Sequence, residues 1–357
     1  MPADPLDPVA LAVDLMRVDS TSGREGEVIA LAHRMLEQRG WRVRRIPVSA
    51  GRDDVLATSN EAPVVTLSTH LDTVPPFIPP RIEDGRLWGR GACDAKGIAA
   101  AMMCAAERLR DRGVPVALLF VVGEETTHDG AHAANAVPTT SRVLINGEPT
   151  DSTLALGTKG AVRATIETRG VAAHSAYPHL GHSAIDDLIS LLHELRGVPL
   201  PVDPVLGETT VNVGMITGGV ADNVVAPAAS ARVMLRTVAS PDETRKLLEV
   251  WLRGRAVLIP GVATPPVRLG TLPGFPTSVM AYTTDIPELT RWGAPYLFGP
   301  GSITVAHGDE EHVAIAELRA AVGAYERLAV GAMEEEGRGK GEEGRGNGNG
   351  ERGAGSG

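Results

Sequence analysis

The sequence predicts a layered α/β domain interrupted by a smaller α+β domain. In the first part of the chain, short apolar runs typical of buried strands alternate with segments of helical periodicity, the pattern of a layered α/β fold. After Gly157 the order changes to strand, helix, two strands and helix, and alternation of the first kind then returns. A length of 357 residues is also more than one ordinary core accommodates, which favours two domains.

The elements of the α/β part follow from apolar periodicity and from turn residues. Helices are expected where apolar residues recur at helical spacing, at residues 7–17, 24–39, 97–112, 285–291 and 311–328. Apolar or alternating runs predict strands at residues 41–48, 55–58, 63–68, 115–122, 143–145 and 294–298. We assign residues 1–159 and 266–333 to this discontinuous domain.

The inserted domain is assigned to residues 160–265, about the size of a small domain. Its expected elements are strands at residues 161–168, 209–216, 229–237 and 262–269, and helices at residues 183–195 and 241–252. Residues 334–357 are almost entirely Gly, Glu, Arg and Asn, and cannot bury apolar area. We therefore expect them to form a disordered tail.

Composition excludes several classes of function. The formal charge of −10, without a dominant basic patch, argues against nucleic acid as a partner. No apolar run approaches the ~20 residues of a transmembrane helix, and residues 1–7 lack the pattern of a signal peptide. The two cysteines, Cys93 and Cys104, fit free thiols in a reducing cytosol. We expect a cytoplasmic protein without a membrane partner.

Ionisable side chains follow three of the predicted strands. His70, the Glu124–Glu125 pair and Glu148 come at strand ends, and Asp94 lies in a glycine-rich segment. The carboxyl ends of strands in an open α/β sheet are where ligand sites form. Imidazole and carboxylate donors without thiolate suit catalytic Zn²⁺, or Co²⁺ or Mn²⁺. The sequence therefore predicts a metal site with these ligands: His70, Asp94, Glu125, Glu148 and His307.

Two neighbouring carboxylates suggest how such a site works. Positions i and i+2 of a strand end face the same way, so the Asp72 carboxylate is expected to accept a hydrogen bond from the second ring nitrogen of His70. Adjacent Glu124 and Glu125 repel each other unless a cation relieves the repulsion. One would bind the metal, and the other would remain free as the general base for a metal-bound water. Taken singly, each residue is more often structural or simply exposed, but their joint occurrence at strand ends favours the site.

These residues together resemble the acetylornithine deacetylase / succinyl-diaminopimelate desuccinylase family of dinuclear zinc hydrolases, which also includes aminoacylases and carboxypeptidases. The resemblance extends over residues 7–330. Its motifs here are His70-Leu71-Asp72, Gly89-Arg90-Gly91-Ala92-Cys93-Asp94-Ala95-Lys96-Gly97, Glu124-Glu125, Gly147-Glu148-Pro149-Thr150 and the late His307, followed by Glu310 or Glu311.

The resemblance implies a zinc-peptidase-like catalytic domain, with a mixed sheet flanked by helices, that binds two divalent metal ions. Asp94 would bridge the two ions, with His70 and Glu148 completing one position and Glu125 and His307 the other. Glu124 would then be the general base. The ions would be Zn²⁺, with Co²⁺ or Mn²⁺ as alternatives, and the peptide bond after Asp94 is often cis in this family.

The inserted domain resembles the family's lid and dimerisation domain, which implies a homodimer. Residues 170–178, Gly-Val-Ala-Ala-His-Ser-Ala-Tyr-Pro, match the lid motif. In that motif His174 would stabilise the oxyanion on the substrate carbonyl, often that of the partner subunit.

The same resemblance implies which residues select the substrate. Asn212 and Arg236 would bind a substrate carboxylate, a task that suits a planar guanidinium. Arg232 lies on the same strand face as Arg236 and is an alternative to it. Lys159 and Thr283 are weaker candidates for the same pocket.

The leading functional hypothesis is hydrolysis of the amide bond of an N-acyl amino acid, of the deacetylase or desuccinylase type. A metal-bridged hydroxide would be the nucleophile, and Glu124 would move the proton. The first alternative is a dipeptidase, tripeptidase or carboxypeptidase on the same dinuclear site. In the family, glutamate at the position of Glu148 accompanies deacylases and carboxypeptidases rather than aminopeptidases. The second alternative is a metal-binding module without catalysis, against which the presence of Glu124 argues.

Overall fold

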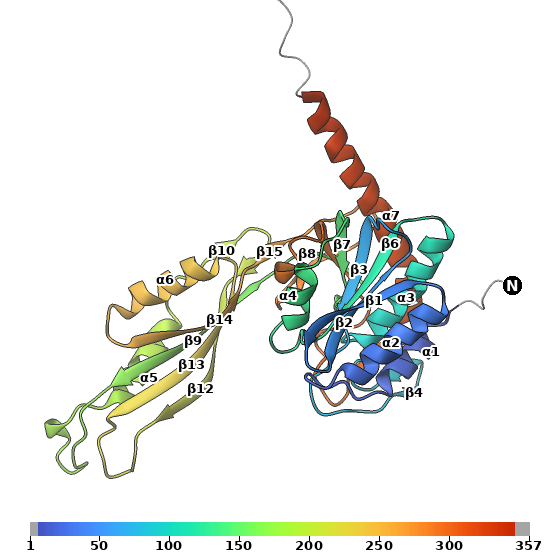
Figure 1. Ribbon diagram of the computed structural model, residues 1–357. Coiled ribbons are helices and arrows are strands. Elements are labelled where there is room, and N and C mark those ends of the chain that lie inside the picture. Colours follow the sequence, from blue (N-terminus) through green and yellow to red (C-terminus); the bar gives the residue numbers. More distant parts are fainter. Residues whose placement is uncertain (1–5, 347–357) are drawn as a thin grey trace, which may run out of the picture. The chain divides into compact units, whose positions relative to one another are not determined.

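The computed structural model describes residues 6–346, with side chains described up to residue 338 (Figure 1). The chain divides into two compact units. The first contains the described residues up to Ala155, together with Leu269–Ser278 and the segment from Thr284 onwards. The second contains Leu156–Arg268 and Val279–Thr283, so the segment predicted as an insertion, residues 160–265, falls inside it.

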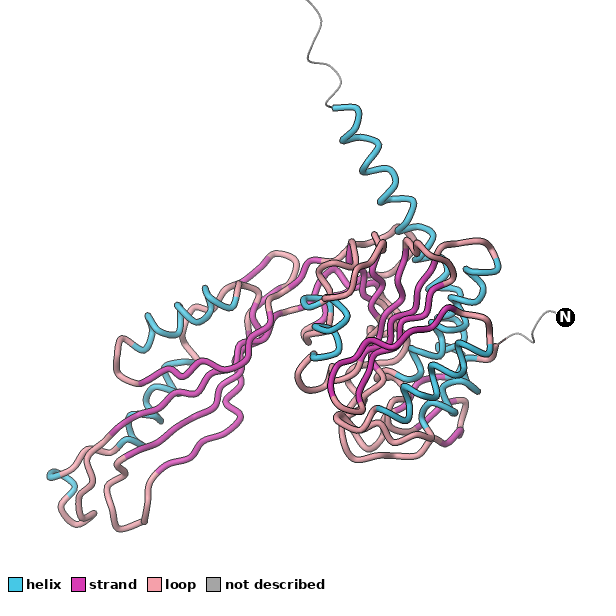
Figure 2. Tube along the Cα trace, viewed as in Figure 1, coloured by secondary structure: helices cyan, strands magenta, loops and turns pink. Residues whose placement is uncertain are grey.

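A six-stranded mixed sheet forms the centre of the first unit. Strands are magenta in Figure 2. Its strands in spatial order are β1 (Arg42–Ser49), β2 (Arg52–Thr58), β6 (Val116–Val121), β3 (Val65–His70), β7 (Val143–Asn146) and β17 (Ala294–Leu297). The pairs β1–β2 and β2–β6 are antiparallel, whereas β3 pairs in parallel with β6 and β7, and β7 with β17. Strands β3, β6 and β7 are buried throughout, which explains the apolar sequence of β6 and of β7 as far as Ile145, whereas β3 also carries polar residues.

Helices cover both faces of this sheet. Alternate strand residues belong to two apolar clusters, one shared with helices α1, α2, α3 and α7 and the other with α4. The bounds are α1 (Pro8–Met16), α2 (Gly26–Gln38), α3 (Lys96–Asp111), α4 (Asp129–Asn135) and α7 (Ile315–Gly346). A smaller sheet of the same unit consists of β4 (Arg81–Glu83), β5 (Arg86–Trp88) and β18 (His312–Ala314). The layered α/β fold with a mixed sheet is therefore confirmed.

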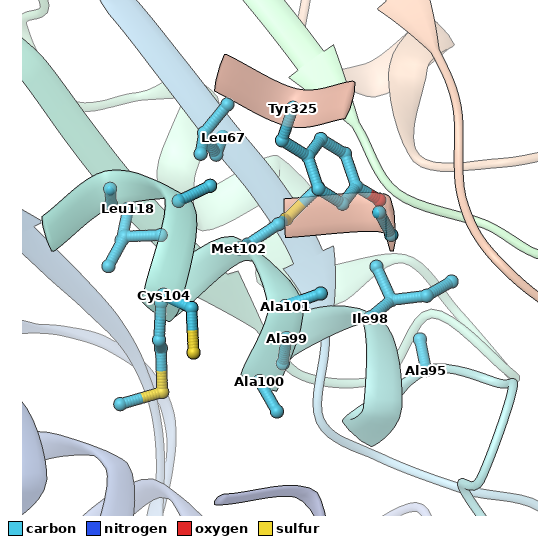
Figure 3. Close-up of a cluster of buried hydrophobic side chains, with 14 of the residues drawn as sticks. Leu67, Ala95, Ile98, Ala99, Ala100, Ala101, Met102, Cys104, Leu118 and Tyr325 are labelled. Atoms are coloured by element: carbon cyan, nitrogen blue, oxygen red, sulfur yellow. The ribbon is translucent and has the colours of Figure 1, made fainter. Parts of the chain in front are cut away.

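Helix α3 is buried along most of its length. Its alanine-rich face, seen in Figure 3, lets α1 and α7 pack closely against it. The Tyr325 hydroxyl of α7 donates a hydrogen bond of 2.8 Å to the Phe298 carbonyl. Gly147 follows β7, and any Cβ there would overlap the side chains of Ile98 and Met102 on α3. The absence of a side chain at Gly147 thus brings the residue after it, Glu148, against the buried start of α3.

The second unit is a four-stranded antiparallel sheet with two helices on one face. The strand order is β12 (Thr210–Gly218), β13 (Ala228–Thr237), β9 (Gly160–Arg169) and β14 (Val257–Thr264), and the helices are α5 (Ala184–Leu195) and α6 (Pro241–Leu252). Inward residues such as Val162, Ala231 and Leu235 are buried under the helices. Short elements complete it: η1 (Pro178–Leu180), β10 (Val202–Asp203) and β11 (Gly207–Glu208). Strands β8 (Leu154–Thr158), β15 (Val267–Arg268) and β16 (Thr277–Met280) form a further sheet.

Three predicted elements differ from the structure. The helix expected at residues 285–291 is only a 3₁₀ turn, η2 (Ile286–Glu288), because Pro287 has no N–H for a longer hydrogen-bonded ladder. The strand expected at residues 262–269 is divided between β14 and β15, since Pro265 and Pro266 cannot donate to a ladder. The helix expected from Glu311 begins at Ile315, after β18.

The predicted disordered tail also differs over part of its length. Helix α7 continues to Gly346, so residues 334–346 are helical. Glutamate and arginine favour helices, and an Arg338–Glu334 pair at 3.7 Å has the i,i+4 spacing that supports one. Residues 347–357 of the predicted tail lie outside the described residues. Within residues 6–346, no helix has both the length and the apolar character needed to cross a membrane.

Candidate active site and metal centre

The parallel strands deliver the predicted ligands to one edge of the main sheet. His70 is the last residue of β3 and pairs with Val121 at the end of β6. Glu124 and Glu125 follow β6, and Glu148 follows β7 by two residues. This arrangement results from sheet topology, because the carboxyl ends of neighbouring parallel strands lie side by side.

Asp94 lies between two histidines and uses a different oxygen for each. Its Oδ1 is 3.0 Å from Nε2 of His70, and its Oδ2 is 3.1 Å from Nε2 of His307. Glu148 Oε2 is 3.9 Å from the same nitrogen of His70. Glu125 Oε1 is 3.0 Å from the same nitrogen of His307. The five predicted ligands thus form two histidine–glutamate pairs on either oxygen of one carboxylate, and the Asp94–Ala95 peptide bond is cis.

Asp72 contacts His70 in two ways and has further partners besides. The nearest group to Nδ1 of His70 is the backbone carbonyl of Asp72, at 2.9 Å, while the Asp72 carboxylate is 3.4 Å away. That carboxylate also accepts hydrogen bonds from the backbone N–H groups of Glu124 (3.1 Å) and Glu125 (3.2 Å) and from the Ser22 hydroxyl (2.8 Å). The turn after β6 needs an acceptor for these N–H groups, and the side chain supplies it. Asp72 therefore positions both glutamates as well as His70.

Glu311 holds the segment that carries Asp94, a role the sequence did not reveal. Its Oε1 accepts hydrogen bonds from the backbone N–H groups of Gly91 (2.9 Å), Cys93 (3.3 Å) and Asp94 (3.2 Å). Its Oε2 is 2.6 Å from Nη1 of Arg90, and both side chains are almost fully buried. The motif left Glu310 and Glu311 as equal candidates for a late acidic residue. Only the fold decides, by turning Glu311 inward and leaving Glu310 exposed.

The electrostatics of the site are dominated by buried acids. Burial raises the pKa of Glu148 well above its usual value, and burial followed by the charge of Glu148 does the same to the pKa of Glu124. Burial alone would lower the pKa of His70, but hydrogen bonds to Asp72 and Asp94 outweigh it and raise that pKa. Hydrogen bonds to Asp94 and then Glu125 raise the pKa of His307 to about 10.

The donor set fits two divalent cations. It contains two imidazoles and three carboxylates, and it contains no thiolate, as catalytic zinc sites of this kind do. Glu148 Oε1 is buried without a hydrogen-bond partner among the described residues, which is costly for a carboxylate oxygen unless a cation satisfies it. The separations of about 3.0 Å between donor atoms also suit ligands at ~2.1 Å around a common ion.

Comparison with known proteins identifies the family. The family model described as "Peptidase family M20/M25/M40" matches residues 66–243. A relative from Aspergillus terreus named "Probable carboxypeptidase" is 38% identical over an alignment of 368 positions, which covers 90% of this chain and 85% of the relative. The chain belongs to the M20 peptidase family. It is therefore a hydrolase of peptide or amide C–N bonds.

Solved structures of M20 peptidases share the fold. Aminopeptidase PepT from Bacillus cereus has a TM-score of 0.75 at 19% identity, covering 90% of this chain and 97% of that chain. A Bacillus subtilis structure described as a dinuclear metal-binding peptidase of the M20 family has a TM-score of 0.67 at 16% identity, covering 92% and 98%. The M20 assignment is wider than the acetylornithine deacetylase / succinyl-diaminopimelate desuccinylase group. It supports the peptidase or carboxypeptidase alternative better than the N-acyl amino acid hydrolase that led the sequence-based hypotheses.

The predicted substrate residues lie in the second unit, apart in sequence from the metal ligands. Asn212 of β12 is opposite Met234 of β13, two residues from Arg236, so Asn212 and Arg236 lie on the sheet face without helices.

The other candidates have contacts of their own. His174 is exposed, and its Nδ1 accepts a hydrogen bond of 3.1 Å from the backbone N–H of Ala176. The remaining two candidates lie between β8 and β9 and after β16. They are Lys159, whose Nζ donates to the Glu208 carbonyl at 2.6 Å, and Thr283, which is half-buried.

Proposed function

We propose that the protein is a dinuclear metallo-carboxypeptidase that removes the C-terminal residue of short peptides. The observation that carries the dinuclear part is the geometry of Asp94, whose two oxygens face different histidine–glutamate pairs at 3.0 and 3.1 Å. A mononuclear site would not need a carboxylate shared between two sets of donors. The M20 relationship and the carboxypeptidase name of a relative support the reaction.

In this proposal His70 and Glu148 would hold one divalent ion, Glu125 and His307 would hold the other, and Asp94 would serve both positions. The ions are Zn²⁺, with Co²⁺ or Mn²⁺ as alternatives. Bound divalent ions lower the pKa of water toward neutrality and polarise a carbonyl oxygen. Asp72 and Glu311 keep the ligands in place through their backbone hydrogen bonds.

Glu124 moves the proton. Its carboxylate is not one of the five ligands, and its backbone is fixed by the hydrogen bond from its N–H to Asp72. Burial raises the pKa of Glu124, which suits a group that first accepts a proton from water and then gives it to the departing amine. The attacking oxygen forms a bond to the carbonyl carbon, the C–N bond breaks, and the proton ends on the amine.

The second unit supplies the substrate contacts in this proposal, as a lid and dimerisation domain of a cytoplasmic homodimer. Arg236 and Asn212 bind the free carboxylate of the substrate, with Lys159 and Thr283 as further candidates. Support comes from Arg236, whose Nη1 is buried without a hydrogen-bond partner in the described chain and is thus available to an anion. His174 stabilises the oxyanion.

A second candidate, hydrolysis of N-acyl amino acids, uses the same machinery. An N-acyl amino acid is the shortest substrate that offers a free carboxylate next to an amide bond. Arg236 and Asn212 would bind it in the same way, so the two activities differ only in the group on the acyl side.

The test is a substrate panel on protein loaded with zinc or cobalt. It compares a free dipeptide, an N-blocked dipeptide, the same N-blocked dipeptide with a C-terminal amide, and an N-acetyl amino acid. Release of the C-terminal residue from the N-blocked dipeptide, and its loss on amidation, is the expected result. Hydrolysis that requires a free N-terminus would contradict the proposal, and preferential cleavage of the N-acetyl amino acid would favour the second candidate.

A further inference from the structure

A second cluster of metal-binding side chains lies beside the proposed dinuclear centre. Glu124, His128 and Asp285 each offer one donor atom, and these atoms lie within 4.8 Å of one another. None of the three is a proposed ligand of the two catalytic ions. We propose that this cluster is a third divalent-cation site, and that its occupation inhibits the enzyme by removing Glu124 from proton transfer.

The loop after β6 builds the cluster. The backbone N–H groups of Thr127 and His128 both donate to the Gly123 carbonyl, at 3.0 and 2.8 Å, which turns the chain back on itself. His128 has φ 54°, a left-handed conformation uncommon for a residue with a side chain. Its Nδ1 lies 2.8 Å from Oδ1 of Asp285, a residue 157 positions later in the chain. The turn thus brings His128 beside Glu124, and η2 brings in Asp285.

Asp285 gives an independent indication of a missing partner. The residue is 1% exposed, and its Oδ2 has no hydrogen-bond partner within the described part of the chain. A buried carboxylate oxygen without a donor is unfavourable. A proton on His128 satisfies only Oδ1, whereas a cation can contact the carboxylate and the imidazole together.

Charge and donor type point to the same ligand. One imidazole and two carboxylates form a site with the charge that balances a divalent ion. Three nitrogen and oxygen ligands with a position left for water are a common zinc environment.

The inhibitory effect rests on the proposed role of Glu124, while the existence of the site does not. A cation coordinated by Glu124 occupies the oxygen that would accept the proton. Activity should therefore rise as the two catalytic positions fill and fall again as the third fills. At a zinc concentration ten times the third dissociation constant, mass action leaves about a tenth of the maximal activity.

The experiment measures zinc stoichiometry and activity on the same samples of full-length protein. Equilibrium dialysis with elemental analysis is expected to show two tight equivalents and a third, weaker one in the wild type. His128→Gln should bind only two, retain its activity when two are bound, and show no inhibition by excess zinc. The matched control is His182→Gln, which removes an exposed histidine paired with Asp187 at 2.6 Å in the other unit. This control should keep both the third equivalent and the inhibition.

Asp285→Asn provides a second variant, in case the left-handed position of His128 tolerates glutamine poorly. A wild type that binds only two equivalents would overturn the proposal, as would a third equivalent that persists in both variants. A third equivalent without inhibition would overturn the inhibitory role. Stoichiometry is read without turnover, so a complete absence of hydrolysis would count against the proposed function and leave this site testable.

Discussion

The two halves of the proposed metal centre share Asp94 but are held very differently. The buried half is His70 with Glu148, and the open half is His307 with Glu125. His70 is 1% exposed at the end of a central strand, whereas the side chain of His307 is 49% exposed on a loop. Nδ1 of His70 is held by the Asp72 carbonyl at 2.9 Å, while Nδ1 of His307 has no hydrogen-bond partner in the described residues.

The buried half is therefore preorganised for its metal ion, whereas the open half is adaptable. A second hydrogen bond fixes the orientation and tautomer of a metal-binding histidine and typically raises metal affinity 10–100-fold. The His70 ring has such a bond and is buried. The His307 ring lacks it, so its orientation depends on the bound metal. We therefore expect the buried half to bind its ion more tightly, and the open half to be the one that loads and unloads.

The largest expected effects come from removing one histidine at a time. His70→Ala should lose the tight equivalent of metal and leave at most a weakly bound one, with activity near that of metal-free protein. His307→Ala should keep one tight equivalent. Metal content after dialysis against a weak chelator checks both. Equal losses in the two variants would remove the distinction between the halves.

Glu124→Ala tests the group that belongs to neither half. Because general acid–base groups contribute about 10²–10⁴-fold, kcat should fall by that factor. Both metal equivalents should remain, since Glu124 is not among their proposed ligands. Steady-state kinetics with metal analysis of the same preparation gives the answer, and near wild-type turnover would show that another group moves the proton.

Glu311→Gln tests how firmly the shared carboxylate is held. The change weakens three backbone hydrogen bonds near Asp94 and leaves the charge of Arg90 buried without its partner. Breaking a buried pair in this way costs about 3–5 kcal/mol of the free energy of unfolding. Denaturant unfolding measures it, with exposed Glu310→Gln as the matched control that should change little. Equal stability of the two variants would mean that the segment before α3 is held by other contacts.

The smallest effect is a pH dependence, which in the open half comes from His307. In metal-free protein the pKa of His307 is raised to about 10 from about 6.5 by Asp94 and Glu125. The proton's contribution to stability is therefore complete below pH ~6.5 and is lost as the pH rises through ~10. Metal must also displace that proton, so affinity should increase with pH over this range. Calorimetry in buffers of different ionisation enthalpy measures the proton released, and an unchanged release in His307→Ala would contradict the assignment.

The sequence predicted the fold and the candidate site best where an apolar run is followed directly by ionisable residues. Apolar runs followed by ionisable residues identified the strands, and parallel topology then required His70, Glu125 and Glu148 to lie at one edge. The layered α/β fold class followed from the same alternation. The ends of helices and strands were predicted less well where a single residue ends the element, as Pro287 does.

Contacts between residues distant in the chain were beyond the sequence. Asp285 meets His128 across 157 positions, and Glu311 meets Gly91 across 220. No periodicity shows which of two adjacent glutamates turns inward, because that depends on how β18 pairs with β5. Helix α7 continues past Glu334 for a related reason, since a helix already formed extends without a new nucleation step, even through residues that have no core of their own to bury.

Anomalous diffraction from crystals of zinc-loaded protein tests the central claim most directly. Two peaks are predicted, one on each side of the Asp94 carboxylate, at ~2.0–2.1 Å from Nε2 of His70 and from Nε2 of His307. The peak at His307 should lose occupancy first as a chelator is soaked in. A single peak, or a pair of peaks that does not share Asp94, would contradict the account.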